Sequence, residues 1–558
     1  MPKCRFWRHE LALVLAFLLS ALPAAAASSP LAVGKVEPRL AVVIVVDQMR
    51  ADYLTRLEGE YRDGFAHFLK EGVDFSETRH DHAITVTAVG HATIATGCFP
   101  AQHGIVGNSW YDRTSGHTVY ACADSTVQIV GDSSAAGCSP RGLLRGTVGD
   151  WLKGVSPQSH VFAISEKDRA AVILGGQHPD GAWWYDDRNG NFVTSTYYTA
   201  QYPEWVEAFN RSEAKDRYYH SGWAKGWPEA AYATAHADSF SAENDGVDIM
   251  FPHRFDTSRG KLDTAYYRML TGTPFSDELL FDFARALISE EQLGADTIPD
   301  LLWISCSATD VIGHSYGPDS QEMVDNLLRL DRYLGGFLRY LDEAVGADGY
   351  VAVMTADHGV MPLPEDLARQ GIMAERIPRA GYRRVIDSVA ANAAESLGIG
   401  APLVVACTNG IVLDTGAALA RGIAPEDMRQ AMAARLRRIS FIDEVMTYGD
   451  LFGPRAVVRG YRDMYRRSFR SDRAPDLALR LVEYTLIDDD RYGTNHGSPY
   501  DYDTHVPLVF AGRGVAHGIA STTPVRTVDI APTLAALLGI RPPNDIDGVT
   551  LKEALVPR

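Results

Sequence analysis

The chain has 558 residues, of which 46% are hydrophobic and 22% are charged. This composition is that of a globular protein and excludes a disordered or collagen-like chain. The length allows either several domains or one large domain with insertions. The formal net charge of −18 argues against a nucleic acid polymer or an anionic membrane as the main partner. It does not argue against a phosphorylated small molecule, because a local cationic site can override a diffuse negative field.

Residues 1–27 have the pattern of a secretory signal peptide. A basic start is followed by an apolar run over residues 11–22 and by four alanines at 24–27, which suit cleavage. The alternative is an N-terminal membrane anchor, but the apolar run is short for a membrane span. We therefore expect a periplasmic or secreted protein with no membrane segment after cleavage.

Five cysteines follow the predicted signal peptide, too few and too scattered for a disulfide framework. Cys122 and Cys138 lie close together in a Gly/Ser-rich segment. In an oxidising compartment they are the expected disulfide pair, and two free thiols are the alternative.

Three apolar runs lead into side chains of the kinds that bind metals. The runs are residues 41–47, 301–310 and 350–358, which end in Asp47, in Asp310 and in the pair Asp357–His358. Buried parallel strands read as continuous Val/Ile/Leu runs. Open α/β sheets bind ligands beyond the carboxyl ends of their strands. The same short stretches therefore predict both a fold and a site.

Strand-like and helix-like segments alternate along much of the chain. Further strands are predicted at the apolar runs 160–165, 171–175 and 505–512, and helices at 321–345 and 528–539. The long helix between two strands forms a strand–helix–strand unit, which is typical of a parallel sheet. We predict an α/β fold with a central, mostly parallel sheet that is flanked by helices on both faces.

Two segments differ from this pattern. Residues 180–295 are rich in aromatic side chains, and residues 370–490 carry many arginines and Ala-rich helical pieces. We interpret both as insertions that border the site, within a single domain that covers residues 28–558.

Six side chains are candidate metal ligands: Asp47, Asp310, His314, Asp357, His358 and His496. Six oxygen and imidazole ligands suffice for two metals with three protein ligands each, and this ligand chemistry suits zinc. Two metals roughly 3.5–4 Å apart would clamp the attacking and leaving oxygens of a displacement at phosphorus. Taken singly, each residue could equally be a cap or a structural histidine, but the joint pattern favours a metal site.

A candidate nucleophile lies in residues 85–97, which read as a helix that starts near Thr85 or Thr87 and ends at Gly97. A hydroxyl at a helix N-terminus faces free backbone N–H groups and the positive end of the helix dipole, which suits a phosphoryl group. A metal would activate this hydroxyl by lowering its pKa. From the local sequence alone, an ordinary threonine N-cap is the alternative.

Several motifs occur together in one order: residues 46–50, 87–91, 104–108, 167–169, 310–314, 356–359 and 495–497. In this combination the chain resembles the alkaline phosphatase superfamily, and more narrowly its bacterial zinc phosphatases with a threonine nucleophile. The resemblance runs from about residue 40 to the C-terminus.

The resemblance implies two Zn²⁺ ions as cofactors and a role for each matching residue. One ion would be held by Asp310, His314 and His496. The second would be held by Asp47, Asp357 and His358, with Thr87 as nucleophile and metal contact. The non-bridging phosphate oxygens would be bound by Asn108, Lys167 and Arg169. The alternative for Lys167 and Arg169 is a solvated pair of loop charges around Asp168.

The implied activity is that of a metal-dependent alkaline phosphatase, which hydrolyses small-molecule phosphate monoesters through a phosphothreonine intermediate. Lys167 and Arg169 favour a monoester, because its dianion presents three non-bridging oxygens to them. A phosphodiesterase or nucleotide pyrophosphatase of the same superfamily is the alternative, since the aromatic residues 183–205 could border a pocket for a second substituent. A sulfatase is disfavoured because Gln102 stands where that motif needs arginine.

A third hypothesis is a secreted phosphate- or metal-binding protein without turnover. The sequence does not fix the oligomeric state, and a monomer is our expectation.

Overall fold

The computed structural model describes residues 37–557, apart from 256–261, 401–402, 455 and 457–458. The predicted signal peptide therefore lies outside the described residues. Within them the largest sheet has nine strands. Their order across the sheet is β10 (Asn191–Val193), β9 (Gly181–Asp186), β8 (Val161–Ser165), β11 (Asp300–Cys306), β1 (Leu40–Val46), β12 (Tyr350–Thr355), β19 (Leu508–Gly512), β2 (Val73–Phe75) and β20 (Ile519–Ser521).

The five strands β9, β8, β11, β1 and β12 run parallel to one another. The next strand, β19, pairs antiparallel with β12 and with β2, and β10 is antiparallel to β9 at the other edge. The predicted strands at 41–47, 160–165, 301–310, 350–358 and 505–512 thus correspond to strands of this sheet. The prediction of a mostly parallel central sheet is confirmed.

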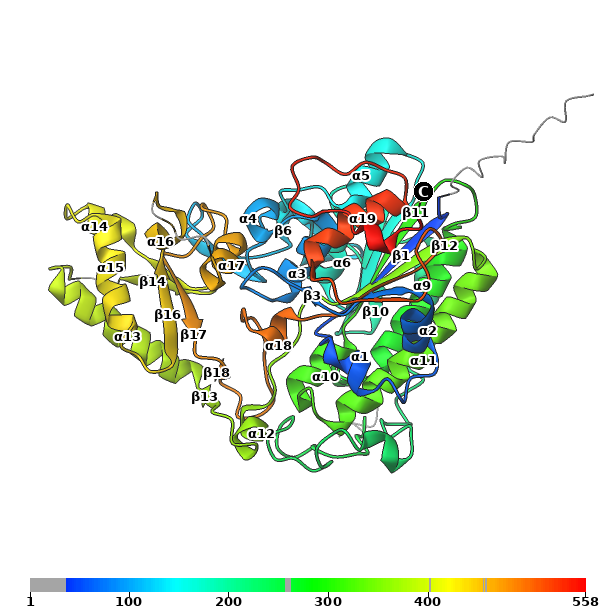
Figure 1. Ribbon diagram of the computed structural model, residues 1–558, viewed down its shortest axis with the longest axis horizontal. Coiled ribbons are helices and arrows are strands. Elements are labelled where there is room, and N and C mark those ends of the chain that lie inside the picture. Colours follow the sequence, from blue (N-terminus) through cyan, green and yellow to red (C-terminus); the bar gives the residue numbers. More distant parts are fainter. Residues whose placement is uncertain (1–36, 256–261, 401–402, 455, 457–458, 558) are drawn as a thin grey trace, which may run out of the picture. The chain divides into compact units, whose positions relative to one another are not determined.

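Alternate side chains of β1 pack into two different cores. Val42 and Ile44 join a cluster with α2 (Gly64–Glu71), α9 (Phe275–Glu290) and α11 (Gln321–Ala344). Val43 and Val45 join a second cluster with α3 (Thr87–Thr96), α5 (Val148–Val155) and α19 (Ile530–Leu537). Because successive strand residues point to opposite faces, helices cover both faces of the sheet, as predicted (Figure 1).

One predicted element is wrong. Residues 171–175 were expected to form a strand, but they belong to helix α6 (Asp168–Gly175), which contacts β8 and β9. Residues 170–175 are all buried, so this short helix is apolar all round. A short continuous apolar run cannot be assigned to helix or strand by periodicity alone. Residues 167–169 therefore lie at the start of a helix and do not precede a strand.

The described residues of the segments 195–255 and 262–274 contain little regular structure, and the first of these segments is anchored on α11 by buried polar contacts. The Trp223 indole donates to Asp325 at 2.7 Å. His253 Nε2 lies 3.0 Å from Glu322 Oε1, and His253 Nδ1 lies 3.0 Å from Asp248 Oδ1. Burial lowers the pKa of His253, but the hydrogen bonds to Asp248 and Glu322 outweigh it and raise this pKa to about 9. The imidazolium form therefore stabilises this anchor.

Residues 375–487 form a structure with its own sheets and core. An antiparallel sheet has the order β14 (Val404–Cys407), β15 (Ile411–Leu413), β17 (Leu477–Leu481) and β16 (Ile442–Thr447). Helices α13 (Arg379–Ser396) and α15 (Pro425–Leu436) pack against it in a separate hydrophobic cluster. The short strands β13 (Glu375–Ile377) and β18 (Thr485–Ile487) pair where this segment leaves and rejoins the remainder of the chain.

Candidate metal centre and phosphate site

The ends of β11, β1 and β12 bring the predicted metal ligands together. Val46 of β1 pairs with Cys306 of β11, and Val45 pairs with Thr355 of β12. Because these strands are parallel, their carboxyl ends share one edge. Asp47 follows β1 directly and Asp357 follows β12. Asp310 and His314 lie on helix α10 (Ala308–Tyr316), which starts after β11.

Three fully buried side chains leave polar atoms unpaired at this edge. His358 Nε2 lies 3.5 Å from Asp47 Oδ1 and 3.4 Å from Asp357 Oδ2. None of these three atoms has a hydrogen-bond partner among the described residues. Orphaned buried polar atoms are costly, and one cation between them would satisfy all three. The donor set therefore fits a metal ion.

A second group of ligand atoms adjoins the first. Asp310 Oδ1 lies 3.2 Å from His314 Nε2 and 3.7 Å from His496 Nε2. One atom from each of Asp310, His314 and His496 lies within 4.8 Å of the others, and the same holds for Asp47, Asp310 and His358. Asp310 therefore borders both groups, and all six predicted ligands converge.

The three histidines are held in one tautomer by backbone carbonyls. Nδ1 lies 2.8 Å from the Thr494 carbonyl in His314, 2.9 Å from the Gly359 carbonyl in His358 and 2.8 Å from the Thr85 carbonyl in His496. A carbonyl oxygen can only accept, so each Nδ1 carries a proton, and in the neutral form of each ring Nε2 presents a lone pair. Metal-binding histidines commonly donate the N–H of their other ring nitrogen to a carbonyl or carboxylate in this way.

The clustered carboxylates make the centre favour cations. Burial, together with the charges of Asp310 and Asp357, raises the pKa of Asp47 well above its usual value. Burial also acts to raise the pKa of Asp310, but the charges of Lys167 and His314 outweigh it and hold this pKa well below its usual range. Lys167 Nζ donates to Asp47 Oδ2 at 2.6 Å and to Asp310 Oδ2 at 2.5 Å. A cation is thus the natural partner of these carboxylates.

The candidate nucleophile lies at the start of a buried helix. Helix α3 begins at Thr87 and ends before Gly97, whose φ of 63° is left-handed, and this confirms the helix predicted at 85–97. A Cβ at Gly90 would lie 2.1 Å from the Asp357 carbonyl oxygen. The absence of a side chain at Gly90 thus lets α3 pack directly against the backbone of a candidate metal ligand.

Two polar side chains, those of Asn108 and Arg169, converge on the N-terminus of α3. Asn108 Oδ1 accepts from the Ala88 amide at 2.9 Å, which leaves the Asn108 NH₂ group free to donate. Arg169 Nη2 lies 3.3 Å from Thr87 Oγ1, and Arg169 Nε is buried without a hydrogen-bond partner. Unsatisfied donors of this kind suit the oxygens of an anion.

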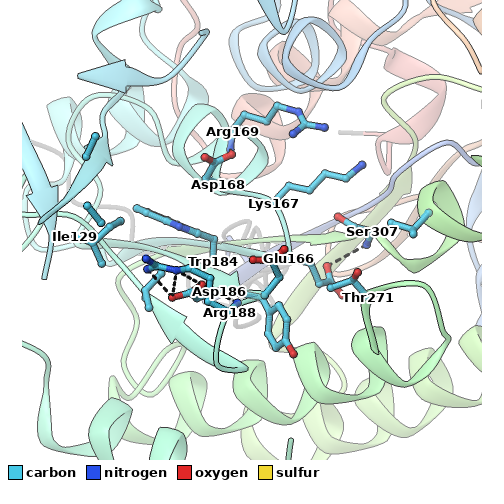
Figure 2. Close-up of a pocket in the computed structure, with 16 residues that line it drawn as sticks. Ile129, Glu166, Lys167, Asp168, Arg169, Trp184, Asp186, Arg188, Thr271 and Ser307 are labelled. Atoms are coloured by element: carbon cyan, nitrogen blue, oxygen red, sulfur yellow. Dashed lines mark hydrogen bonds and ion pairs between the residues drawn. The ribbon is translucent and has the colours of Figure 1, made fainter. Parts of the chain in front are cut away.

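Lys167 and Arg169 extend in the same direction from the segment that carries them (Figure 2). The Lys167 side chain is only 13% exposed, so it does not fit the alternative of a solvated loop charge. The carboxylate of the intervening Asp168 is bound by other groups, since its Oδ1 accepts from Tyr120 Oη and from the Arg169 backbone amide, each at 2.6 Å, and its Oδ2 from the Cys138 thiol at 3.4 Å. Cys122 and Cys138 are thiols whose sulfur atoms lie 2.9 Å apart.

The sequence reasoning missed two residues beside the ligands. Gln48 donates from its side chain to Asp310 at 2.7 Å and from its backbone to Asp357 at 3.1 Å. His91 Nδ1 donates to the Thr87 carbonyl at 2.8 Å and for that reason leaves Asp357 Oδ2, 3.1 Å away, without a hydrogen bond, while His91 Nε2 lies 2.8 Å from Ser305 Oγ. In the sequence, these two residues are marked only by their positions relative to predicted site residues. Gln48 follows Asp47, and His91 lies one helical turn after Thr87.

Asn409, in the turn between β14 and β15, was also missed. Its Nδ2 donates to the Val106 and Ser109 carbonyls, each at 3.0 Å. These carbonyls flank Asn108. No local sequence pattern marks Asn409, because the contact joins two segments that are far apart in the chain.

Among the described residues, no helix combines the length and the apolar character that a membrane crossing needs.

Comparisons with known proteins agree with this geometry. Residues 41–436 match the family model described as type I phosphodiesterase / nucleotide pyrophosphatase. The chain is 33% identical to alkaline phosphatase PafA of Elizabethkingia meningoseptica over 93% of this chain and 94% of that protein. It is also 33% identical to alkaline phosphatase PhoV of Synechococcus elongatus over 93% of each chain. The crystal structure of wild-type PafA superposes with a TM-score of 0.86 at 31% identity, over 93% of this chain and 99% of that one.

Proposed function

The chain belongs to the type I phosphodiesterase/nucleotide pyrophosphatase family of the alkaline phosphatase superfamily, and from this premise we propose that it is a metal-dependent alkaline phosphatase. It hydrolyses small-molecule phosphate monoesters to an alcohol and inorganic phosphate. One observation carries the choice of monoesters, namely the position of two cations. Lys167 Nζ donates to the carboxylates of Asp47 and Asp310, and Arg169 Nη2 donates to Thr87 Oγ1. Two cations thus meet where a dianionic phosphoryl group would carry its charge.

Two Zn²⁺ ions are proposed as the cofactors. Asp310, His314 and His496 would hold one ion, and Asp47, Asp357 and His358 the other, with Thr87 as a further contact. When bound, the ions supply positive charge that lowers the pKa of the Thr87 hydroxyl and stabilises the leaving oxygen. The orphaned atoms of Asp47, Asp357 and His358 support this proposal.

The protein's own groups then carry out two displacements. Thr87 Oγ1 attacks phosphorus, the ester oxygen departs with a proton as the alcohol, and a phosphothreonine forms. Water attacks this phosphorus next, which releases phosphate and restores the Thr87 hydroxyl. In both steps Asn108, Lys167 and Arg169 donate to the non-bridging oxygens.

We propose the periplasm or the extracellular space as the location. The support is the pattern of residues 1–27, with its basic start, apolar run and four alanines.

A phosphodiesterase is the second candidate, and one cavity favours it. A cavity of about 470 Å³ extends behind Lys167 and Arg169 and is bordered by Trp184, Thr271 and Val311 (Figure 2). Such a cavity could receive the second substituent of a diester.

Replacing Arg169 by alanine separates the two candidates. We expect kcat/KM for an aryl phosphate monoester to fall by a factor that corresponds to on the order of 2–4 kcal/mol of lost transition-state stabilisation. The loss for a methyl aryl phosphate diester is expected to be much smaller. Arg188→Ala is the matched control, since Arg188 borders the same cavity but pairs with Asp186 at 2.8 Å. Equal losses on both esters would favour the diesterase.

The hypothesis of a binding protein without turnover needs a separate test. Zinc-loaded wild-type protein should hydrolyse an aryl phosphate far faster than Thr87→Ala does. If the two rates are equal, the protein is not an enzyme of this class.

A further inference from the structure

A second cavity, of about 460 Å³, adjoins the metal centre at His496. Its lining includes Val86, the residue before Thr87. It also includes Arg379 and Arg383 of helix α13. This cavity therefore connects the reacting centre with the segment 375–487.

The position of His496 indicates which part of a substrate this cavity would receive. In the proposed function, Thr87 attacks phosphorus in line, so the leaving group departs away from Thr87 Oγ1. Of the two proposed ions, the one that Asp310, His314 and His496 would hold is not assigned to Thr87, so it would face the leaving oxygen. His496 is the member of that group that borders the cavity, so the cavity is placed to hold the leaving group.

The charge of this cavity is unusual for an acidic chain. Its lining includes Arg379 and Arg383, and no aspartate or glutamate of the described residues contributes to it. The cavity behind Lys167, by contrast, is lined by four carboxylates as well as by cations: Glu166, Asp168, Asp186 and Asp187. Although the whole chain has a formal net charge of −18, the two arginines therefore supply the charged groups in the described lining of this cavity.

Both arginines keep donors for a ligand. Arg379 Nε lies 3.5 Å from Asp488 and Arg383 Nε lies 2.9 Å from Asp387. These contacts are made at Nε, and Arg383 Nη1 also donates to Cys407 Sγ at 3.8 Å. Each guanidinium carries further N–H groups on its Nη atoms that can donate to an anion. Tyr382, together with Leu479 and Leu481 of β17, also lines the cavity, which suits an organic body.

We propose that this cavity is a leaving-group subsite, and that it selects phosphate monoesters whose leaving group carries a second anionic group, a carboxylate or a phosphate, at its far end. This inference rests on the proposed phosphatase function and names the class of substrate that the function serves.

The test compares two esters that differ only in that distant charge. They are the phosphate ester of 3-(4-hydroxyphenyl)propanoate and the matching ester of its amide. The ethyl arm separates the charge from the phenol oxygen, so the two leaving groups have similar reactivity. The measured quantity is the ratio of kcat/KM for the acid to kcat/KM for the amide. The variants are Arg379→Gln and Arg383→Gln. The matched control is Arg384→Gln, which removes the same charge from the same exposed helix but does not border the cavity.

Wild-type protein should prefer the acid, and the ratio should fall about threefold to tenfold in Arg379→Gln and Arg383→Gln, as expected for loss of a partly exposed charge contact. Arg384→Gln should keep the wild-type ratio. An unchanged ratio in the two cavity variants, with both esters still hydrolysed, overturns the subsite and leaves the phosphatase intact. If wild-type protein hydrolyses neither ester, the proposed function fails, and the subsite fails with it.

Discussion

Asn409 offers a test of whether the segment 375–487 sets the geometry of the phosphate site. Its side chain donates to the carbonyls of Val106 and Ser109, each at 3.0 Å. A Cβ at Gly107 would lie 1.9 Å from Asn409 Nδ2, so the amide lies directly against the loop that carries Asn108. Asn409→Ala removes both hydrogen bonds and leaves this loop without its support.

The size of the effect follows from the contacts. Each neutral hydrogen bond contributes about 1 kcal/mol net, so the loop loses about 2 kcal/mol of restraint. We expect most of this loss to reach the transition state, because Asn108 must be held in place to donate to phosphate. The expected result is about a tenfold fall in kcat/KM for an aryl phosphate, which corresponds to about 1.4 kcal/mol. Asn409→Asp should lose at least as much, since it places carboxylate oxygens against two carbonyls.

A double-mutant cycle with Asn108→Ala decides whether Asn409 acts through Asn108. In the Asn108→Ala background, Asn409→Ala should cost little further kcat/KM, which gives a coupling energy of about 1 kcal/mol. Asn392→Ala, at an exposed position on α13, is the control and should have no effect. If Asn409→Ala causes the same fold loss in both backgrounds, the positioning argument is refuted.

Three further predictions concern the metal centre and stability. Chelation should lower the melting temperature of wild type and of Thr87→Ala alike, and Zn²⁺ should restore it in both but restore aryl phosphate turnover only in wild type. Gly90→Ala should lower the free energy of unfolding in urea by about 3 kcal/mol, because its Cβ would lie 2.1 Å from a backbone oxygen, whereas Gly59→Ala, with nothing within 4 Å, should not. The His253 pKa of about 9 exceeds the unfolded value of about 6.5, so its stabilisation is complete below pH ~6.5 and is lost as pH rises through the folded pKa. In wild type, the free energy of unfolding should fall by on the order of 2 kcal/mol between pH 7 and 9 because of this group. His253→Gln should abolish this part of the pH dependence, and exposed His67→Gln should not.

The sequence was most informative where burial on two faces imposes a simple pattern. The ends of β1 and β12 could be located because a strand covered on both faces must be apolar at nearly every position, so Asp47 and Asp357 stand out at once. The same reasoning failed at residues 171–175, since a short helix that is buried all round is also continuously apolar. Local pattern therefore predicts burial more reliably than it predicts the type of element.

The remaining parts of the site depend on contacts between distant segments. His496 lies in the centre because its Nδ1 donates to the Thr85 carbonyl, and Asn409 supports Asn108 from another sheet. Neither contact has a periodicity or a spacing that a sequence could display. The resemblance to known phosphatases identified the chemical motif of His496, whereas Asn409 belongs to no motif, and only the structure places it.

The two cavities differ in the charges that line them. Beside Arg169 the cavity mixes cations with four carboxylates, so it offers little net attraction to an anion beyond the phosphoryl group itself. Beside His496 the described lining holds two arginines and no carboxylate, so in the proposed subsite these charges act on the leaving group. Long-range attraction cannot explain such a preference in a chain with a net charge of −18, because distant surface charges are screened beyond a Debye length of about 10 Å. Selectivity for ester type and selectivity for leaving group should therefore reside in different residues, each acting over the length of a hydrogen bond.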